Sequence, residues 1–140
     1  MRWVVDASVA VKWLVAEEGR PAARKLLHPA MHLNAPDLIF PEVSNALMKK
    51  VRAGEIAFEQ AEEAARRFPS YLDEVRPTGA LIPEALRLAQ ALSHAVYDCI
   101  YLACAKGDER VVTADGQFLA KARAAGHAHR IVGLDDPALA

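Results

Sequence analysis

The first six residues hold the feature that most limits how this chain can fold. Trp3, Val4 and Val5 form an apolar run that stops at the carboxylate of Asp6, and a helix-like pattern follows at once over residues 9–14. Residues branched at Cβ favour strands, and an apolar run without alternation indicates a strand covered on both faces, as in a parallel sheet. Ligands of such sheets bind beyond the carboxyl ends of the strands. We therefore expect Asp6 to lie at a functional site.

The rest of the chain alternates between strand-like and helix-like segments. Further strands are predicted at residues 31–35, 74–77, 110–113 and 130–132. Helices are predicted at residues 22–27, 37–52, 55–72, 83–92, 96–106 and 115–124. Pro41 is expected to kink its helix or to mark a restart. This alternation predicts an α/β fold in three layers, with a mainly parallel central sheet of about four to five strands, formed by residues 1–140 as one domain.

Composition narrows the class of protein. In 140 residues, 17 basic side chains nearly balance 18 acidic ones, so a general basic surface for nucleic acid is not expected. No apolar stretch approaches the ~20 residues that span a bilayer, and the N-terminus lacks the pattern of a signal peptide. We therefore expect a cytoplasmic protein without membrane contact. Cys99 and Cys104 do not share a face of their predicted helix, so neither a disulfide nor a zinc site is expected of them.

Four acidic residues occupy positions of the same kind. Asp6 ends the first strand, and Asp115 follows the fourth. Glu42 and Asp98 lie early in helices that follow strands or turns. Carboxylates that converge at one sheet edge repel one another unless a divalent cation neutralises them, and oxygen ligands favour Mg²⁺ or Mn²⁺ over zinc. Taken singly, each has a simpler explanation, because the three aspartates could cap helices and Glu42 could be a surface acid.

The helix of Glu42 also carries a polar stripe. Glu42, Asn45 and Lys49 share one helix face, which could meet a metal ion and then a phosphate backbone, or could be an exposed polar surface. The sequence has neither a nucleotide-binding glycine pattern nor a nucleophile elbow. Its 5 histidines are scattered, and none is expected to be catalytic.

Four short motifs together resemble the PIN domain family. They are Asp6-Ala7-Ser8 after the first strand, Pro41-Glu42 with Asn45, Asp98 at the start of a helix, and Thr113-Ala114-Asp115 before Phe118. The likeness runs from Arg2 to about Leu134. It is greatest to the small free-standing PIN proteins that act as VapC-type toxins in toxin–antitoxin pairs, and it implies a PIN-like α/β/α fold.

This resemblance implies a metal-dependent endoribonuclease that hydrolyses RNA phosphodiester bonds. The acidic quartet of the family corresponds to Asp6, Glu42, Asp98 and Asp115, which would hold one or two Mg²⁺ or Mn²⁺ ions, with Glu42 acting through water. In such a site a divalent ion activates water for in-line attack on phosphorus. Ser8 and Thr113 correspond to supporting hydroxyl positions. Gly116 and Gln117 stand where some members carry a further acid.

The partners implied are an RNA substrate, a cognate antitoxin and a second copy of the chain in a homodimer. Because the net charge is −1, we expect RNA binding to depend on a local groove. The predicted lining of this groove is Lys12, Lys49, Arg52 and Lys121. Two other functions stay open. One is a catalytically inactive PIN-like module that binds RNA or serves as a scaffold. The other is a phosphatase or phosphotransfer domain with Asp6 as nucleophile, although Ser8 stands where such phosphatases carry a second aspartate.

Overall fold

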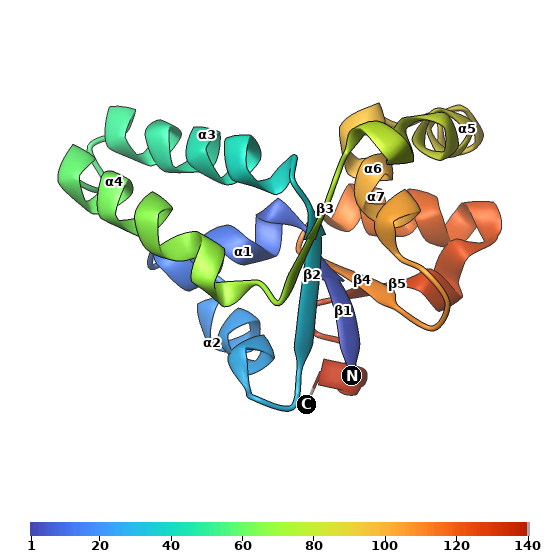
Figure 1. The fold of residues 1–140 in the computed structure, drawn as a ribbon, viewed down its shortest axis with the longest axis horizontal. Helices are drawn as coiled ribbons and strands as arrows, with labels where there is room; N and C mark the ends of the chain where they lie inside the picture. Colours follow the sequence, from blue (N-terminus) through green and yellow to red (C-terminus); the bar gives the residue numbers. More distant parts are fainter. Residues whose placement is uncertain (140) are drawn as a thin grey trace.

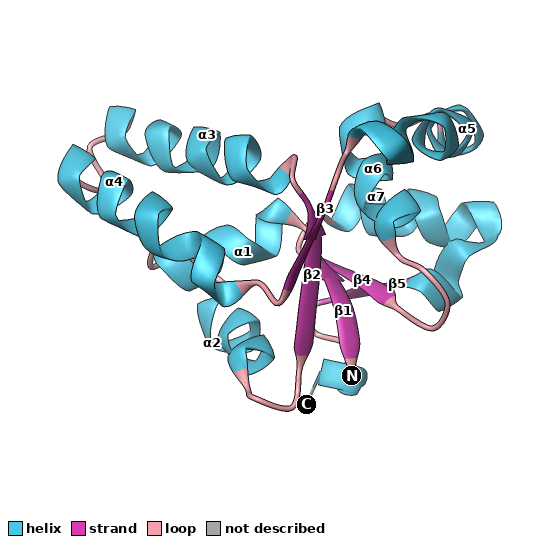
Figure 2. Ribbon diagram, in the orientation of Figure 1, coloured by secondary structure: helices cyan, strands magenta, loops and turns pink. Residues whose placement is uncertain are grey.

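A parallel sheet lies at the centre of the structure (Figure 2), a computed structural model that describes residues 1–139. Its strands are β1 (Arg2–Val5), β2 (His32–Pro36), β3 (Glu74–Arg76), β4 (Arg110–Thr113) and β5 (Ile131–Gly133). Within the described residues the sheet has the order β3-β2-β1-β4-β5, and each neighbouring pair is parallel. The prediction of a parallel α/β sheet is confirmed.

Helices lie on both sides of this sheet (Figure 1). One side carries α1 (Ala7–Leu14), α2 (Arg20–Arg24), α3 (Ile39–Arg52) and α4 (Phe58–Arg67). The other side carries α5 (Ile82–Leu92), α6 (Val96–Cys104) and α7 (Gly116–Ala122). Short 3₁₀ or π turns lie at Lys25–Leu27, Phe68–Tyr71, Gly79–Leu81, Arg123–His127, Ala128–Arg130 and Pro137–Leu139. Between residues 1 and 139, no helix combines the length and the apolar character needed to cross a membrane.

The first strand, β1, is the middle of the sheet. Trp3, Val4 and Val5 have no exposed surface, and Val4 lies opposite Asn34 of β2 on one side and Val111 of β4 on the other. The unbroken apolar run therefore has the cause inferred from the sequence, because helices cover this strand from both faces.

Pro41 does not kink its helix. Helix α3 runs without interruption over Ile39–Arg52, and Pro41 lies in its first turn. The backbone nitrogens of a first turn have no partner within the helix, so a proline there costs no hydrogen bond. The expected kink or restart at this position was wrong.

The helix predicted at residues 55–72 is shorter in the structure. It begins at Phe58, and the backbone N–H of the preceding residue, Ala57, donates to the Gln60 side chain at 2.8 Å. It ends at Arg67, where a 3₁₀ turn that contains Pro69 begins. Its buried residues are Ala61 and Ala64, so the packed face follows helical spacing towards Phe68.

The direction in which the strands are added changes between β1 and β4. From β1 the chain builds outward to β2 and β3, whereas β4 and β5 lie on the opposite side of β1. In open α/β sheets, ligands bind at such a switch point, outside the carboxyl ends of the strands. Asp6 follows β1 and Asp115 follows β4, so the fold brings these two acids to that position.

Candidate metal centre

Asp6 is the innermost acid of the site. It is only 4% exposed, and it occupies the N-cap position of α1 without making a side-chain capping bond. Instead its Oδ2 accepts hydrogen bonds from Ser8 Oγ at 2.8 Å and from Thr113 Oγ1 at 2.7 Å. Two hydroxyls from different segments therefore fix the orientation of this carboxylate. The simple capping explanation does not describe Asp6.

Burial makes the charge of Asp6 unfavourable. Loss of hydration raises the pKa of this carboxyl to about 6, and the nearby acids Asp98 and Glu42 act in the same direction. The hydroxyls of Thr113 and Ser8 lower the pKa of Asp6 but do not outweigh burial. A buried carboxylate surrounded by other carboxylates is stabilised by a cation bound among them.

Glu42 lies in the first turn of α3 and faces α6 across the site. Its Oε1 accepts a 2.6 Å hydrogen bond from the hydroxyl of Tyr101, a fully buried residue one turn beyond Asp98 on α6. Burial raises the pKa of Glu42 and the charge of Asp98 adds to this, while the Tyr101 hydroxyl lowers it. The partly buried Glu42 is thus held by a specific partner, unlike an acid on an open surface.

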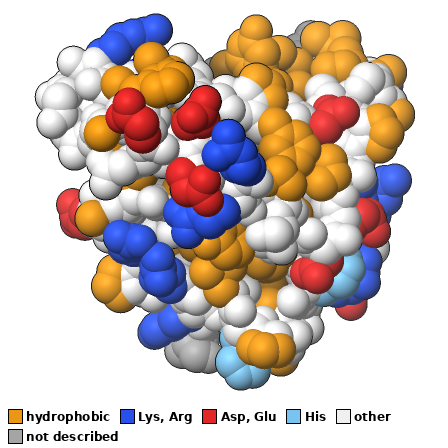
Figure 3. All heavy atoms as spheres, turned by 60° about the vertical axis from the view of Figure 1, so that its left-hand side comes forward, with side chains coloured by type: hydrophobic (Ala, Val, Ile, Leu, Met, Phe, Trp, Pro, Cys, Tyr) orange, Lys and Arg blue, Asp and Glu red, His pale blue; other side chains and the backbone are white. Residues whose placement is uncertain are grey.

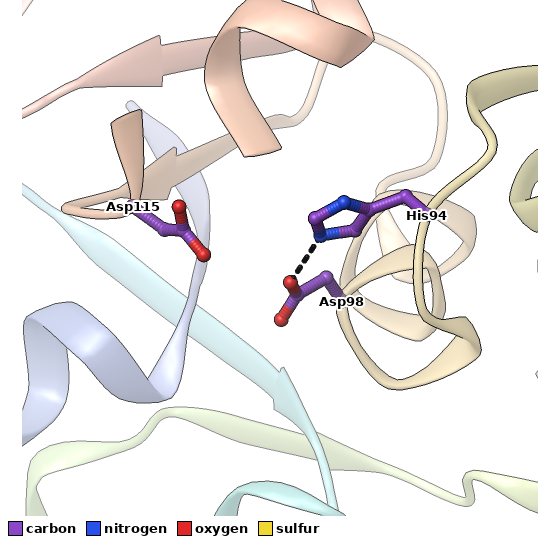
Figure 4. Close-up of side chains that lie close together, drawn as sticks. All are labelled: His94, Asp98 and Asp115. Carbon is purple, nitrogen blue, oxygen red and sulfur yellow. Dashed lines mark hydrogen bonds and ion pairs between the residues drawn. The ribbon is translucent and has the colours of Figure 1, made fainter. Parts of the chain in front are cut away.

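Asp98 lies in the first turn of α6, beside His94 (Figure 4). The Nε2 of His94 and the Oδ2 of Asp98 are 2.5 Å apart. His94 and Asp98 lie four residues apart around the start of α6, and Asp115 comes from the start of α7. Each offers one ligand atom within 4.8 Å of those of the others, a spacing that would allow one metal ion to be shared. The side chain of Asp98 makes its hydrogen bond with His94 and points towards Asp115 (Figure 4).

Asp115 does cap a helix. Its Oδ1 accepts hydrogen bonds from the backbone N–H groups of Gln117 at 3.0 Å and Phe118 at 3.2 Å, at the start of α7. The capping explanation is correct for this residue, but both bonds use the same oxygen. Because a carboxylate has two oxygens, capping and metal binding are compatible here.

The four acids meet in one cleft. It has a volume of about 280 Å³, and its lining consists of Asp6, Ala7, Ser8, Val11, Glu42, Asn45, Ala46, Lys49, Asp98 and Asp115. The cleft brings hard oxygen donors from four segments together with a single lysine. Such a donor set fits Mg²⁺ or Mn²⁺, which prefer carboxylate oxygens and water. The polar stripe predicted on α3 forms one wall, because Glu42, Asn45 and Lys49 all line the cleft.

The four predicted RNA-binding residues differ in their surroundings. Lys49 is exposed at the cleft, and Arg52 is exposed in the last turn of the same helix. Lys12 donates to Glu17 Oε1 at 3.0 Å and to the Glu18 backbone oxygen at 2.7 Å, and Lys121 donates to the Ser93 backbone oxygen at 3.0 Å. Basic and acidic side chains are interspersed on the face shown in Figure 3. The groove stays a prediction, and Lys12 and Lys121 would have to exchange these partners for phosphate.

Sequence reasoning missed His94 and Tyr101. Both belong to the segment around Asp98, at four residues before it and three residues after it. These are helical spacings, but His94 lies before the start of α6, so no helical pattern pointed to it. Tyr101 was within the predicted helix, but its bond to Glu42 depends on where the fold places α3, which lies on the other side of the sheet from α6 (Figure 1).

Comparisons with known proteins identify the family and the fold of the chain. The model of the family described as PIN domain matches residues 3–124. Ribonuclease VapC1 of Mycobacterium tuberculosis is 32% identical over 123 residues, which cover 81% of this chain and 90% of that protein. The crystal structure of PAE2754 from Pyrobaculum aerophilum has a TM-score of 0.71 at 24% identity, over 96% of this chain and 85% of that one. The crystal structure of VapBC2 from Rickettsia felis bound to a DNA fragment from its promoter has a TM-score of 0.66 at 13% identity, over 95% of this chain and 98% of that one. The two solved structures show the shared fold.

Proposed function

The chain belongs to the PIN domain family, and from this premise we propose that it is a metal-dependent endoribonuclease, the toxin of a toxin–antitoxin pair. The observation that carries the proposal is the meeting of Asp6, Glu42, Asp98 and Asp115 in one cleft at the switch point of the sheet. Four carboxylates brought together without a cation would repel one another. The ribonuclease activity in the name of the Mycobacterium tuberculosis relative supports the same interpretation.

We assign Asp6, Asp98 and Asp115 as direct ligands of one or two Mg²⁺ or Mn²⁺ ions, and Glu42 as a ligand acting through water. A divalent cation, when bound there, supplies activation of water and neutralises charge on a scissile phosphate. Ser8 and Thr113 keep Asp6 turned towards the cleft through their hydroxyls. Tyr101 holds Glu42 in the same way.

Asn45 and Lys49 extend the site along α3. Both line the cleft beside Glu42, so an amide and an ammonium group lie next to the acids. A phosphodiester at the acids would place its neighbouring phosphate oxygens within reach of this wall. We therefore assign Lys49 to phosphate binding and Asn45 to support of the bound backbone.

We propose an antitoxin protein as the partner of the chain, and a second copy of it in a homodimer. The structural neighbour from Rickettsia felis is a VapBC2 assembly on promoter DNA, which supports the pairing of such a fold with a second protein. Because the substrate is cellular RNA, we place the reaction in the cytoplasm.

The decisive experiment is RNA cleavage by the purified protein with Mg²⁺, with Mn²⁺ or with EDTA, comparing wild type and Asp98→Asn. The control is Asp108→Asn, the same change at an exposed loop position outside the cleft. We expect cleavage with metal by wild type and by the control, and none with EDTA or by Asp98→Asn. Products should carry 5′ phosphate and 3′ hydroxyl ends.

Two results would contradict the proposal. Cleavage that persists in EDTA or in folded Asp98→Asn would show that these acids do not form the site. Metal binding without cleavage of any tested cellular RNA would favour a PIN-like module that binds RNA without cutting it.

A further inference from the structure

The segment before α6 is held in an unusual conformation. Ser93 has φ 50° and ψ 51°, and within residues 1–139 it is the only residue other than glycine with positive φ. Residues with a Cβ atom avoid this region, so non-glycine residues found there point to a local requirement. Lys121 of α7 donates to the Ser93 backbone oxygen at 3.0 Å, and the His94 N–H donates to Ala89 at 3.2 Å. These bonds hold the turn that delivers His94.

The ring of His94 lies between two helices of the site. On one side its Nε2 lies 2.5 Å from Asp98 Oδ2, in α6. On the other side its ring stacks on Phe118 of α7, with centroids 5.3 Å apart and planes at 15°. Phe118 is fully buried, and its backbone N–H donates to Asp115 Oδ1 at 3.2 Å. The His94 side chain thus connects Asp98 with the helix that Asp115 caps, and it is only 8% exposed.

We propose that His94 is a positioning residue that fixes Asp98 relative to Asp115 and thereby sets the affinity of this pair for a divalent cation. The inference rests on the proposed function, because it takes these acids as metal ligands. An ionised carboxylate can only accept, so the Nε2–H donates to Asp98 Oδ2 and leaves Oδ1 for the cation. While it donates, Nε2 is not itself a metal ligand. The strained turn at Ser93 and the Phe118 stack keep the ring in this place.

The test measures Mn²⁺ binding by calorimetry and electron paramagnetic resonance, without RNA, on wild type and three variants of His94. His94→Gln can keep an N–H donor at the reach of Nε2, whereas the amide of His94→Asn is too short, and His94→Leu has no donor. Loss of a hydrogen bond that orients a metal ligand typically weakens metal binding about 10–100-fold. We expect at least a tenfold loss for His94→Asn and His94→Leu, and affinity close to wild type for His94→Gln.

A role confined to folding would not give this pattern, because Asn and Gln differ here chiefly in reach. Circular dichroism and thermal unfolding identify any variant that fails to fold. If His94→Leu does not fold, the difference in Mn²⁺ affinity between His94→Gln and His94→Asn still tests the inference. In the wild type, pulsed resonance of bound Mn²⁺ should show no directly coordinated ¹⁴N, which is a test independent of every variant.

The contrary outcomes are distinct. Folded His94→Asn or His94→Leu that binds Mn²⁺ as wild type does would overturn the inference, as would directly coordinated ¹⁴N in the wild type. Wild type that binds no Mn²⁺ would overturn it together with the metal centre. Binding that depends on His94, in a protein that cleaves no tested RNA, would overturn the proposed ribonuclease and leave the inference standing.

Discussion

The hydroxyl of Tyr101 donates a 2.6 Å hydrogen bond to Glu42 Oε1 and so joins α6 to α3 across the cleft. Tyr101 is fully buried, and burial together with the charges of Glu42 and Asp6 raises the pKa of its phenol far above its usual value. The phenol therefore remains a donor at any pH at which RNA is stable. Its bond also lowers the pKa of Glu42, which burial and Asp98 raise.

Tyr101→Phe should weaken cleavage with little loss of structure. The change removes one donor, so the Glu42 carboxylate loses its orientation and becomes easier to protonate. Hydrogen bonds of this kind to metal-site carboxylates are worth about 10–100-fold in metal affinity or activity. We expect a loss in that range in the rate of RNA cleavage at fixed Mg²⁺, with partial recovery at higher Mg²⁺. Tyr71→Phe, outside the cleft, is the control, and an equal loss there would contradict the assignment.

Asp6→Asn should stabilise the metal-free protein while it abolishes cleavage. The Asn side chain can still accept hydrogen bonds from the hydroxyls of Ser8 and Thr113. The substitution removes a buried charge that other acids surround. Because one pKa unit corresponds to about 1.4 kcal/mol, a shift from 3.8 to about 6 predicts a gain of roughly 2–3 kcal/mol above pH 7. Urea unfolding in EDTA measures this gain.

Added Mg²⁺ provides the complementary observation. Ligands that bind only the folded state stabilise it by mass action, so Mg²⁺ should raise the free energy of unfolding of wild type but not of Asp6→Asn. The exposed change Asp108→Asn should alter neither value. Equal stability of wild type and Asp6→Asn in EDTA would show that burial of this charge is not unfavourable.

The positions of Asp6 and Asp115 could be predicted from the sequence because strand ends determine them. An apolar strand that stops at Asp6 and another that stops just before Asp115 define the same sheet edge once the sheet is parallel. The hydroxyls of Ser8 and Thr113 lie within two residues of these acids, so they come to the same place.

The partners that tune the site could not be predicted in this way. The bond between Tyr101 and Glu42 joins α6 to α3 from opposite sides of the sheet, so it depends on the whole fold. The position of His94 depends on the αL turn at Ser93, for which serine is not a usual signal. Likewise, Glu17 lies beyond the end of α1, so no helical spacing indicates that its carboxylate accepts from Lys12. Pairing between elements is decided by tertiary packing.

Glu109 forms a buried ionic network at the start of β4, at the opposite end of this strand from Asp115. Its two oxygens accept from both terminal nitrogens of Arg76, at 2.7 and 2.8 Å, and from Asn34 Nδ2 at 2.7 Å. The Arg76 bonds hold the pKa of Glu109 at about 2, below the ordinary value of 4.5. Arg76 of the edge strand β3 is thereby attached to the residue that precedes β4.

This depressed pKa predicts how stability depends on acid. A carboxyl whose pKa is lower in the folded state contributes stability above its unfolded pKa and loses that contribution as pH falls through the folded pKa. Glu109→Gln should therefore cost about 3 kcal/mol at pH 7, and the gap to wild type should close between about pH 4.5 and 2. Urea unfolding over this range measures it. Glu63→Gln, on an exposed ion pair, should cost less than about 1 kcal/mol, and a gap for Glu109→Gln that does not change with pH would refute the assignment.

Lys49 and Arg52 should supply more of the RNA affinity than Lys12 and Lys121. The first two are exposed on α3, and Lys49 lines the cleft, whereas the last two already donate to groups of the protein. Neutralising Lys49 and Arg52 should weaken RNA binding and reduce its dependence on salt. The slope of the logarithm of the binding constant against the logarithm of salt concentration should decrease by about 0.7 for each phosphate of a single strand that the protein no longer neutralises. Fluorescence anisotropy with labelled RNA in EDTA gives both quantities. Unchanged affinity and slope after neutralising all four would rule out the groove.

Glu17 should restrain RNA binding. Its carboxylate lies 3.0 Å from Lys12 Nζ and 2.8 Å from Lys50 Nζ, and although partial burial opposes them, these two lysines lower the pKa of Glu17. The acid therefore stays ionised and neutralises cations on α1 and α3, beside the wall that carries Lys49. Glu17→Gln would remove the negative charge shared by the two ammonium groups while keeping the size of the side chain. Lys12 would keep its bond to the Glu18 backbone oxygen, and Lys50 its ion pair with Glu55 at 3.3 Å. We expect tighter RNA binding and a salt slope steeper by about 0.7 to 1.4, as if one or two more phosphates were neutralised.

Glu18→Gln makes the same change of net charge at an exposed neighbour whose backbone oxygen, not its carboxylate, binds Lys12. If both variants shift affinity equally, overall charge rather than loss of the two ion pairs of Glu17 is responsible. An effect confined to Glu17→Gln shows that this carboxylate competes with RNA for Lys12 and Lys50.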